Sequence, residues 1–421
     1  MPEETRIGIA RRDITPPVGE SLSGYIHREP PSTGILDPLS LQAMTVEESG
    51  TAAVVIAADL VGSDGPANEA LRAAVSEATG VPATHIVWHS VHTHASPSFH
   101  KYRGMARASD AYLDQVTAAA VTAAGEAMAR AVPMEAHWAR ARVPDVSHNR
   151  RRADGPIDDV AIVVLFETPD KHRFRLVNWQ CHPVCLGSDN RSISADYVGA
   201  FRRAVVDRTG DGAFYLNGCC GDLNPVGRGP EARIVTGEAL AVQAVDAHPL
   251  RPASLSPVRV ASREVAFPLR REIDVDWLAD YATAERARLD TVHDTLARRE
   301  CGAMIEWAEA LLAAIRSGDL PDDPRSEITA IRLGDIAMVF LPCEALCAIG
   351  MALKAHKAVP IIMPVTCTGK VVGYIGTPEE FATGGYELDV AARYYGLLPF
   401  EPVAGQVLQD AALELLTEVG G

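Results

Sequence analysis

Short apolar runs alternate with helical patterns along most of this chain, and that alternation limits the folds open to it. The predicted strands are 52–58, 86–88, 134–143, 160–166, 174–179, 213–216, a pair within 328–341, and 361–365. The predicted helices include 68–78, 110–131, 196–207, one that begins at Glu344, and 406–416. Such alternation is typical of α/β proteins. We therefore predict an α/β fold of mixed β-sheets flanked by helices.

The length of the chain bears on its domain organisation. At 421 residues it exceeds the usual size of one hydrophobic core, so one large domain or two closely joined domains are expected. We find no repeat, low-complexity tract or flexible linker, and the exposed loop 317–324 is the nearest feature to a boundary. We predict a single domain over 1–421, with any sub-boundary near 317–325.

Composition and charge exclude some partners. Apolar residues make up 47% and charged residues 22%, as in ordinary soluble enzymes. The net charge of −16 argues against nucleic acid and anionic membranes as partners. The first six residues are acidic and lack an apolar segment, and no run is long enough to span a membrane. We expect a cytoplasmic protein that acts on a small molecule; its oligomeric state, homo-oligomer included, stays open.

The eight cysteines fall mostly in apolar or motif-like segments, and we expect them to be reduced thiols. The spacings of Cys181 with Cys185 and of Cys343 with Cys347 resemble neighbours on a helix more than a zinc ribbon. A disulfide or a cysteine-bound metal is therefore not expected.

A His-Thr-His run follows the predicted strand 86–88. Side chains two apart on a strand point to the same face, so His92 and His94 are expected to point together. Paired imidazoles at a strand end commonly begin a metal site, above all for zinc. The alternative is a pair of solvated loop histidines.

Two further strand ends carry groups that bind metals. His182 follows the strand 174–179 and precedes a proline, which favours extended backbone before it. Glu344 directly follows an apolar strand, where it either stabilises the first turn of a helix or completes a His2Glu zinc set. Because ligands of α/β proteins bind at the carboxyl ends of strands, these positions favour one shared site.

Two loops add candidate polar groups. The turn 217–225 is interrupted by glycines and holds Asp222 and Asn224. Such turns can bring backbone N–H groups to a ligand. Alternatively, Asp222 simply caps the next segment. The later loop carries Tyr374 and Tyr386 among glycines, where phenols can bind a metal or a tetrahedral intermediate, or merely cover a core edge.

Taken together, these segments resemble the catalytic domain of the neutral/alkaline non-lysosomal ceramidases. The similarity runs in order along nearly the whole chain, in segments none of which is decisive alone. They are 7–19, 34–37, Asp59, 92–94, 193–197, 221–225, 342–344 and 386–387. No counterpart of the family's C-terminal immunoglobulin-like domain or secretory signal is expected here.

The resemblance implies roles for individual residues. The zinc ligands of the family fall on His92, His182, Glu344 and Tyr386. His94 matches the second histidine of the site, near the scissile group. Arg150 matches an arginine that contacts substrate, although arginine runs such as 150–152 are usually solvated. The tyrosine that supports the transition state is either Tyr394 or Tyr395, and we choose Tyr395. We assign Asp222 and Tyr374 to substrate binding.

One departure from the family pattern bears on the substrate. Asn224 stands where the ceramide hydrolases have serine, and an amide can donate to an oxyanion or orient a water but cannot be a nucleophile. We predict a hydrolase with one Zn²⁺ that cleaves an amide bond in a small soluble substrate by metal-activated water. A lactone, an ester or a cyclic amide are alternative substrates. From another class, a catalytically silent homologue that binds a metal or ligand is the rival that Asn224 favours.

Overall fold

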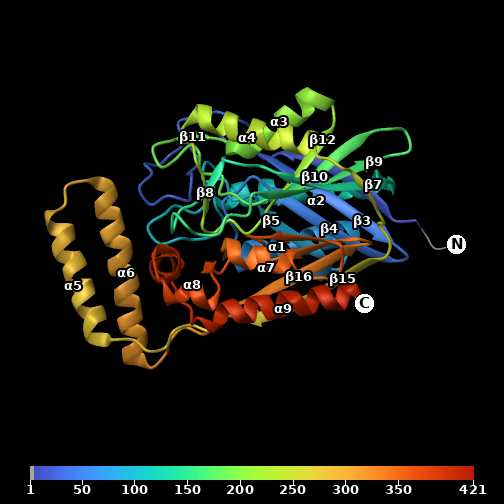
Figure 1. Ribbon diagram of the computed structural model, residues 1–421. Coiled ribbons are helices and arrows are strands. Elements are labelled where there is room, and N and C mark those ends of the chain that lie inside the picture. The colour runs from blue at the N-terminus through green and yellow to red at the C-terminus, as the bar shows by residue number, and fades with distance from the viewer. Residues whose placement is uncertain (1–3) are drawn as a thin grey trace.

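The computed structural model describes residues 4–421 and has the mixed α/β architecture that the sequence predicts (Figure 1). Three sheets form its centre. Helices α3 (Asp196–Thr209) and α4 (Pro230–Val245) lie above them in this view, and α9 (Val403–Gly420) lies below. This arrangement brings the ends of several strands together.

The first sheet has the order β5-β4-β3-β1-β6. Its strands are β1 (Arg6–Asp13), β3 (Ser40–Glu48), β4 (Thr51–Ala58), β5 (Ile86–Ser90) and β6 (Val132–Pro133). Helices α1 (Gly65–Thr79) and α2 (Asp110–Ala129) pack on one face of it. Helix α1 begins where the Asp64 side chain accepts from the backbone N–H of Ala67 and ends at Gly80, whose φ of 74° suits glycine.

The second sheet has the order β12-β10-β9-β7-β14. Its strands are β7 (Glu135–Arg142), β9 (Val160–Glu167), β10 (Arg173–Trp179), β12 (Gly212–Asn217) and β14 (Arg251–Ala253). Strands β9 and β10, which correspond to the predicted strands 160–166 and 174–179, pair antiparallel. Strand β12 joins β10 in parallel, so the ends of β10 and β12 lie at the same edge.

The third sheet, of order β15-β16-β17-β19, consists of β15 (Val258–Ala266), β16 (Arg325–Leu333), β17 (Ile336–Phe340) and β19 (Ile361–Val365). Between β15 and β16 the chain leaves the sheet to form the long helices α5 (Val275–Thr291) and α6 (Thr295–Ser317). The segment 317–325 leads from α6 back to β16, which pairs with β15. This return to one sheet supports the single-domain prediction, which stays a prediction.

Short elements complete the chain. They are the pairs β2 (Gly34–Ile35) with β11 (Ser192–Ile193), β8 (Ser147–Asn149) with β13 (Leu223–Pro225), and β18 (Glu344–Ala345) with β20 (Tyr374–Ile375). The helices are α7 (Cys347–Lys354), α8 (Pro378–Ala382), and single turns at Ala83–His85, Tyr386–Val390 and Ala391–Arg393.

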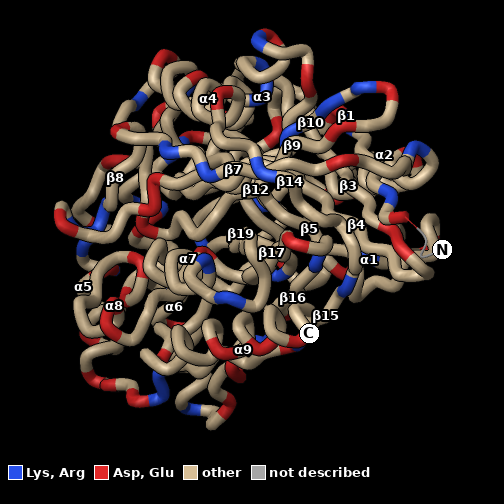
Figure 2. The backbone as a smooth tube through the Cα atoms, turned by 45° about the vertical axis from the view of Figure 1, so that its right-hand side comes forward, with Lys and Arg blue, Asp and Glu red and all other residues tan. Residues whose placement is uncertain are grey.

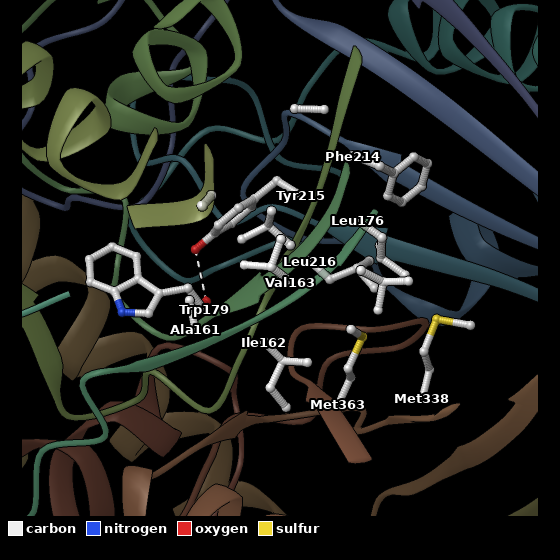
Figure 3. Close-up of a cluster of buried hydrophobic side chains, with 14 of the residues drawn as sticks. Ala161, Ile162, Val163, Leu176, Trp179, Phe214, Tyr215, Leu216, Met338 and Met363 are labelled. Carbon is white, nitrogen blue, oxygen red and sulfur yellow. Dashed lines mark hydrogen bonds between the residues drawn. The ribbon is translucent and has the colours of Figure 1, made fainter. Parts of the chain in front are cut away.

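One hydrophobic core joins the three sheets. Figure 3 shows Leu176 and Phe214 of the second sheet beside Met338 and Met363 of the third. The Tyr215 hydroxyl donates to the carbonyl of Trp179 over 2.8 Å, so the polar end of this buried ring is satisfied. Full burial of such side chains stabilises the fold by about 1.5–3 kcal/mol each.

Charged residues of both signs lie along the outer segments of the chain (Figure 2). In the view of Figure 2, acidic and basic segments alternate along the outer helices and loops, so the net charge of −16 is distributed over them. Among residues 4–421, no helix combines the length and the apolar character needed to cross a membrane.

Three local predictions are wrong. Strand β5 ends at Ser90, so His92 and His94 do not alternate along a strand; His92 instead has a positive φ of 74°. Glu344 does not begin a helix, because it pairs in β18 and α7 starts only at Cys347. The two cysteine pairs are not helical neighbours either, since 181–185 lies in a loop and Cys343 precedes β18. All eight cysteines are buried, and none in the described chain is paired.

Candidate metal centre

His92 is held at the end of the first sheet by backbone contacts. Its N–H donates to Leu60 O over 2.9 Å, and its ring Nδ1 lies 2.6 Å from Val61 O. Because a carbonyl can only accept, Nδ1 carries a proton, and Nε2 is the nitrogen that can present a lone pair. The left-handed backbone of His92 turns this lone pair into the interior, where the side chain is only 2% exposed.

His182 is oriented in the same way from the second sheet. It follows β10, and its ring Nδ1 lies 2.6 Å from Cys220 O in the turn after β12. Its backbone N–H donates to Leu223 O over 2.9 Å. The parallel pairing of β10 and β12 therefore explains why the glycine-rich turn lies against this histidine. Its Nε2 is again the nitrogen with the free lone pair.

Glu344 meets both histidines from β18, which follows strand β17 of the third sheet. Its Oε2 lies 3.1 Å from Nε2 of His92 and 3.1 Å from Nε2 of His182. Its backbone N–H donates to Gly373 O over 2.8 Å, which holds β18 in place. One carboxylate oxygen and two imidazole nitrogens therefore meet at the same point, an arrangement that a cation lying there would stabilise.

His94 stands beside this group. Its Nε2 lies 3.1 Å from Nε2 of His92, and its Nδ1 is buried without a partner among the described residues. One nitrogen each from His92, His94 and His182 falls within 4.8 Å of the others. A Cβ at Gly24 would come 2.5 Å from Cγ of His94, so only glycine leaves room for this ring.

Burial sets the ionisation of these groups. It lowers the pKa of His182 to about 4, and it holds the pKa of His94 well below its usual value, with the neighbouring His92 adding to the effect. Burial acts to raise the pKa of Glu344, but His92 and His182 outweigh it and hold that pKa well below its usual value. The neutral imidazoles that burial favours at His94 and His182, and the ionised form of Glu344, are the forms that bind metal.

The donor set fits a transition-metal ion. Imidazole nitrogens with one carboxylate suit zinc and its neighbours in the periodic table rather than calcium or magnesium, which prefer oxygen ligands. The Nδ1 contacts of His92 and His182 with carbonyls are the outer hydrogen bonds that orient metal-bound histidines. The cluster of His92, His94 and His182 could therefore hold a metal ion, with Glu344 in contact.

The two candidate tyrosines occupy different places. Tyr395 donates from its hydroxyl to Oε1 of Glu344 over 2.5 Å. Tyr386 lines the same cavity but is 49% exposed, and no hydrogen bond joins it to His92, His182 or Glu344 in the described chain. The centroid of its ring lies 6.3 Å from the ring centroid of Tyr374 and 6.5 Å from that of Tyr394.

Arg150 forms a second polar group of the site. Its Nε donates to Glu387 over 2.8 Å, one Nη to Asn224 Oδ1 over 3.3 Å, and the other to the Tyr374 hydroxyl over 3.2 Å. A guanidinium has five N–H donors, so these three contacts leave donors for a ligand. The predicted residues Arg150, Asn224 and Tyr374 are thus brought together.

Asp222 contacts protein rather than open space. Its Oδ1 accepts from the N–H of Cys347 over 2.7 Å, and its Oδ2 accepts from the Asn149 side chain over 2.7 Å. Its own carbonyl accepts from the N–H of Arg150 over 2.8 Å. Burial raises the pKa of this carboxyl. These contacts tie the turn after β12 to the segment that carries Arg150.

A cavity of about 240 Å³ connects the two polar groups. Its lining includes His92, His94, Glu344, Arg150 and several tyrosines. Lining residues outside the sequence prediction are Gly24, Tyr25, Val61, Tyr102, Met105 and Ala391, whereas Tyr394, the alternative to Tyr395, also lines the cavity. Glu387, which orients Arg150, was also absent from the predicted site, although its pairing with Tyr386 in the family motif was the available signal.

Comparisons with known proteins support the fold. No protein-family model matches the chain, and no curated protein matches it. A crystal structure of neutral ceramidase from Pseudomonas aeruginosa matches with a TM-score of 0.75 and 16% identity over 99% of this chain and 75% of that one. A ceramidase complexed with C2 matches with a TM-score of 0.75 and 15% identity over the same shares, 99% and 75%. The chain therefore has a ceramidase-like fold, as its sequence predicts.

Proposed function

We propose that this protein is a zinc-dependent hydrolase that cleaves an amide bond in a small molecule. The observation that carries the proposal is the convergence of His92, His182 and Glu344 beside a cavity that His92 and Glu344 line. The ceramidase-like fold adds support, since amide hydrolysis is the reaction that the name of those neighbours denotes. In this proposal His92, His182, Glu344 and Tyr386 hold the ion.

The other residues of the site bind the substrate, transfer protons and stabilise the oxyanion in this proposal. When bound, the ion polarises the carbonyl of the substrate and lowers the pKa of a nearby water. Arg150 binds a substrate oxygen through its unused N–H donors. His94, neutral at pH 7 and with an unpartnered Nδ1, moves a proton between water and the leaving nitrogen. Asn224 and Tyr395 help to stabilise the tetrahedral oxyanion, Tyr374 contacts substrate in the cavity, and Asp222 supports binding indirectly by holding the segment that carries Arg150.

Turnover with and without a chelator tests the proposal. The purified protein is assayed on a panel of N-acylated amines, esters and lactones, then treated with a chelator and resupplied with zinc. We expect amide hydrolysis that the chelator abolishes and zinc restores. Hydrolysis of lactones or esters alone would show that the substrate is an ester or lactone and not an amide. No turnover by a protein that holds zinc would favour the silent homologue.

Tyr395 is expected to tune the affinity for the ion. Tyr395→Phe removes the hydroxyl that donates to Glu344, and loss of such an outer contact lowers metal affinity by about 10- to 100-fold. Competition with a fluorescent zinc chelator measures the change. Tyr386→Phe is the matched variant: an equal or larger loss supports Tyr386 as a ligand, and an unchanged affinity removes it from the set. Unchanged affinity in Tyr395→Phe would contradict the assignment of its contact.

Glu387 is expected to control how Arg150 meets the substrate. Its Oε1 accepts from Arg150 and its Oε2 lies 3.4 Å from Nε of Arg151. Glu387→Ala frees the guanidinium, and such misplacement lowers kcat/KM by about 10- to 100-fold. Glu387→Gln, which keeps a hydrogen-bond acceptor for Arg150, should recover part of the lost kcat/KM. The exposed Glu379→Ala serves as control, and zinc content should stay unchanged in all three. An effect on zinc content alone would count against this role.

A further inference from the structure

Helices α5 and α6 form a hairpin that stands at one side of the body (Figure 1). The two helices pack mainly on each other and on the segment that follows Tyr386. Along α5 only Leu278 and Ala282 are buried, whereas α6 buries one face that includes Met304 and Trp307. The hairpin is inserted between two neighbouring strands, so the third sheet does not need it.

The inner face of α6 packs directly behind the candidate site. Ala303 and Met304 form a buried cluster with Ile26 and Tyr394, and Met105 packs against it. Tyr394 and Met105 also line the cavity that contains His92 and Glu344. These two side chains therefore lie between the cavity and the cluster that Ala303 and Met304 of α6 help to form.

Polar contacts fix the hairpin against this wall. Arg299 donates to the carbonyls of Ile26 over 3.2 Å and Arg28 over 2.7 Å. The Trp307 indole donates to Leu397 O over 2.9 Å. A Cβ on Gly104 would come 2.9 Å from Cβ of Ala303, so the loop before Met105 lies against α6 with no spare room. The wall is thus closely packed.

The cavity is small for its proposed task. Its volume of about 240 Å³ lies below the ~300–1,000 Å³ typical of sites for larger organic ligands. The polar part of the cavity is formed by Arg150 and by the groups that could hold a metal ion. Its apolar surface is formed by Met105, Ala391 and the tyrosine rings. An apolar group of the substrate gains most by lying on that surface.

We infer that Met304, acting through Met105 and Tyr394, limits the apolar group of the substrate to a short chain. This inference rests on the proposed function, which it deepens: the substrate class is amides of short acyl groups. Met304 is a specificity-determining residue that need not touch the substrate. Truncating it leaves space into which the flexible Met105 side chain can move, so that a longer chain enters.

A ladder of substrates tests this inference. Acetyl, butanoyl, octanoyl and dodecanoyl amides of one chromogenic amine are compared on wild type, Met304→Ala and Met105→Ala. The wild type should favour the short acyl groups. In both variants the ratio of kcat/KM for octanoyl over acetyl should rise by about tenfold or more. Met351→Ala, which truncates a methionine that is 43% exposed, should leave the ratio unchanged.

Other outcomes separate the two proposals. A wild-type preference for dodecanoyl, or an unchanged ratio in both variants, would overturn the inference while leaving amide hydrolysis intact. If no acyl amide is hydrolysed, the proposed function fails, and calorimetric binding of the matching carboxylic acids then tests the size limit alone. If Met304→Ala does not fold, Met105→Ala decides, because its side chain lies in a partly buried loop.

Discussion

His182→Ala is expected to abolish both metal binding and hydrolysis. The side chain is fully buried, and its Nδ1 contact with Cys220 directs Nε2 at Glu344. Alanine removes this proposed ligand atom and leaves the Glu344 carboxylate with one imidazole fewer. Since a metal ion supplies several kcal/mol of transition-state stabilisation, kcat/KM should fall by about 10³-fold or more.

The measurement pairs a steady-state assay with zinc analysis of the same samples. His172→Ala is the matched control, because that imidazole is 84% exposed and makes no contact with the site. It should keep wild-type zinc and activity. Full zinc content in His182→Ala would show that this histidine is not a ligand, whatever happens to the activity.

Asp59→Ala is expected to produce the largest loss of stability. Asp59 is fully buried and accepts from Nη1 of Arg202 over 2.8 Å and from the Ser40 N–H over 2.8 Å and hydroxyl over 2.9 Å. Removing it leaves the Arg202 guanidinium buried without a counter-charge, although two of its nitrogens already lack partners in the described chain. The free energy of unfolding should fall by about 3–5 kcal/mol.

Urea unfolding followed by circular dichroism measures this loss. Glu414→Ala breaks an exposed ion pair with Arg263 and is the control, with an expected change within about 1 kcal/mol. Asp59 directly follows β4, and the next residue accepts from the backbone of His92, so zinc affinity should fall as well. A loss as small as that of the control would contradict a structural role for the buried pair.

Much of the fold could be predicted because its signals are local. The apolar runs of β4, β9, β10 and β19 and the helices α1, α2 and α3 carry periodicity that the sequence displays over many residues. The pair β18 and β20 has two residues on each side and so has no period to detect. Its pairing is long-range, which explains why Glu344 was expected in a helix.

The candidate site was predictable at its strand ends and not in its surroundings. His92, His182 and Glu344 follow apolar runs. The fold brings Oε2 of Glu344 to 3.1 Å from Nε2 of each histidine. The positive φ of His92 has no signal in a His-Thr-His run, since it depends on the contact with Leu60. The cavity wall built by α6 depends on packing between segments far apart in sequence, which composition does not encode.

The metal content of the purified wild-type protein tests the central claim most directly. Elemental analysis is made on protein as isolated, after chelation, and after zinc is added back and excess removed. The account predicts about one zinc ion per chain, lost on chelation and regained on addition. A protein that holds no zinc even after addition would contradict the assignment of His92, His182 and Glu344 as a metal centre.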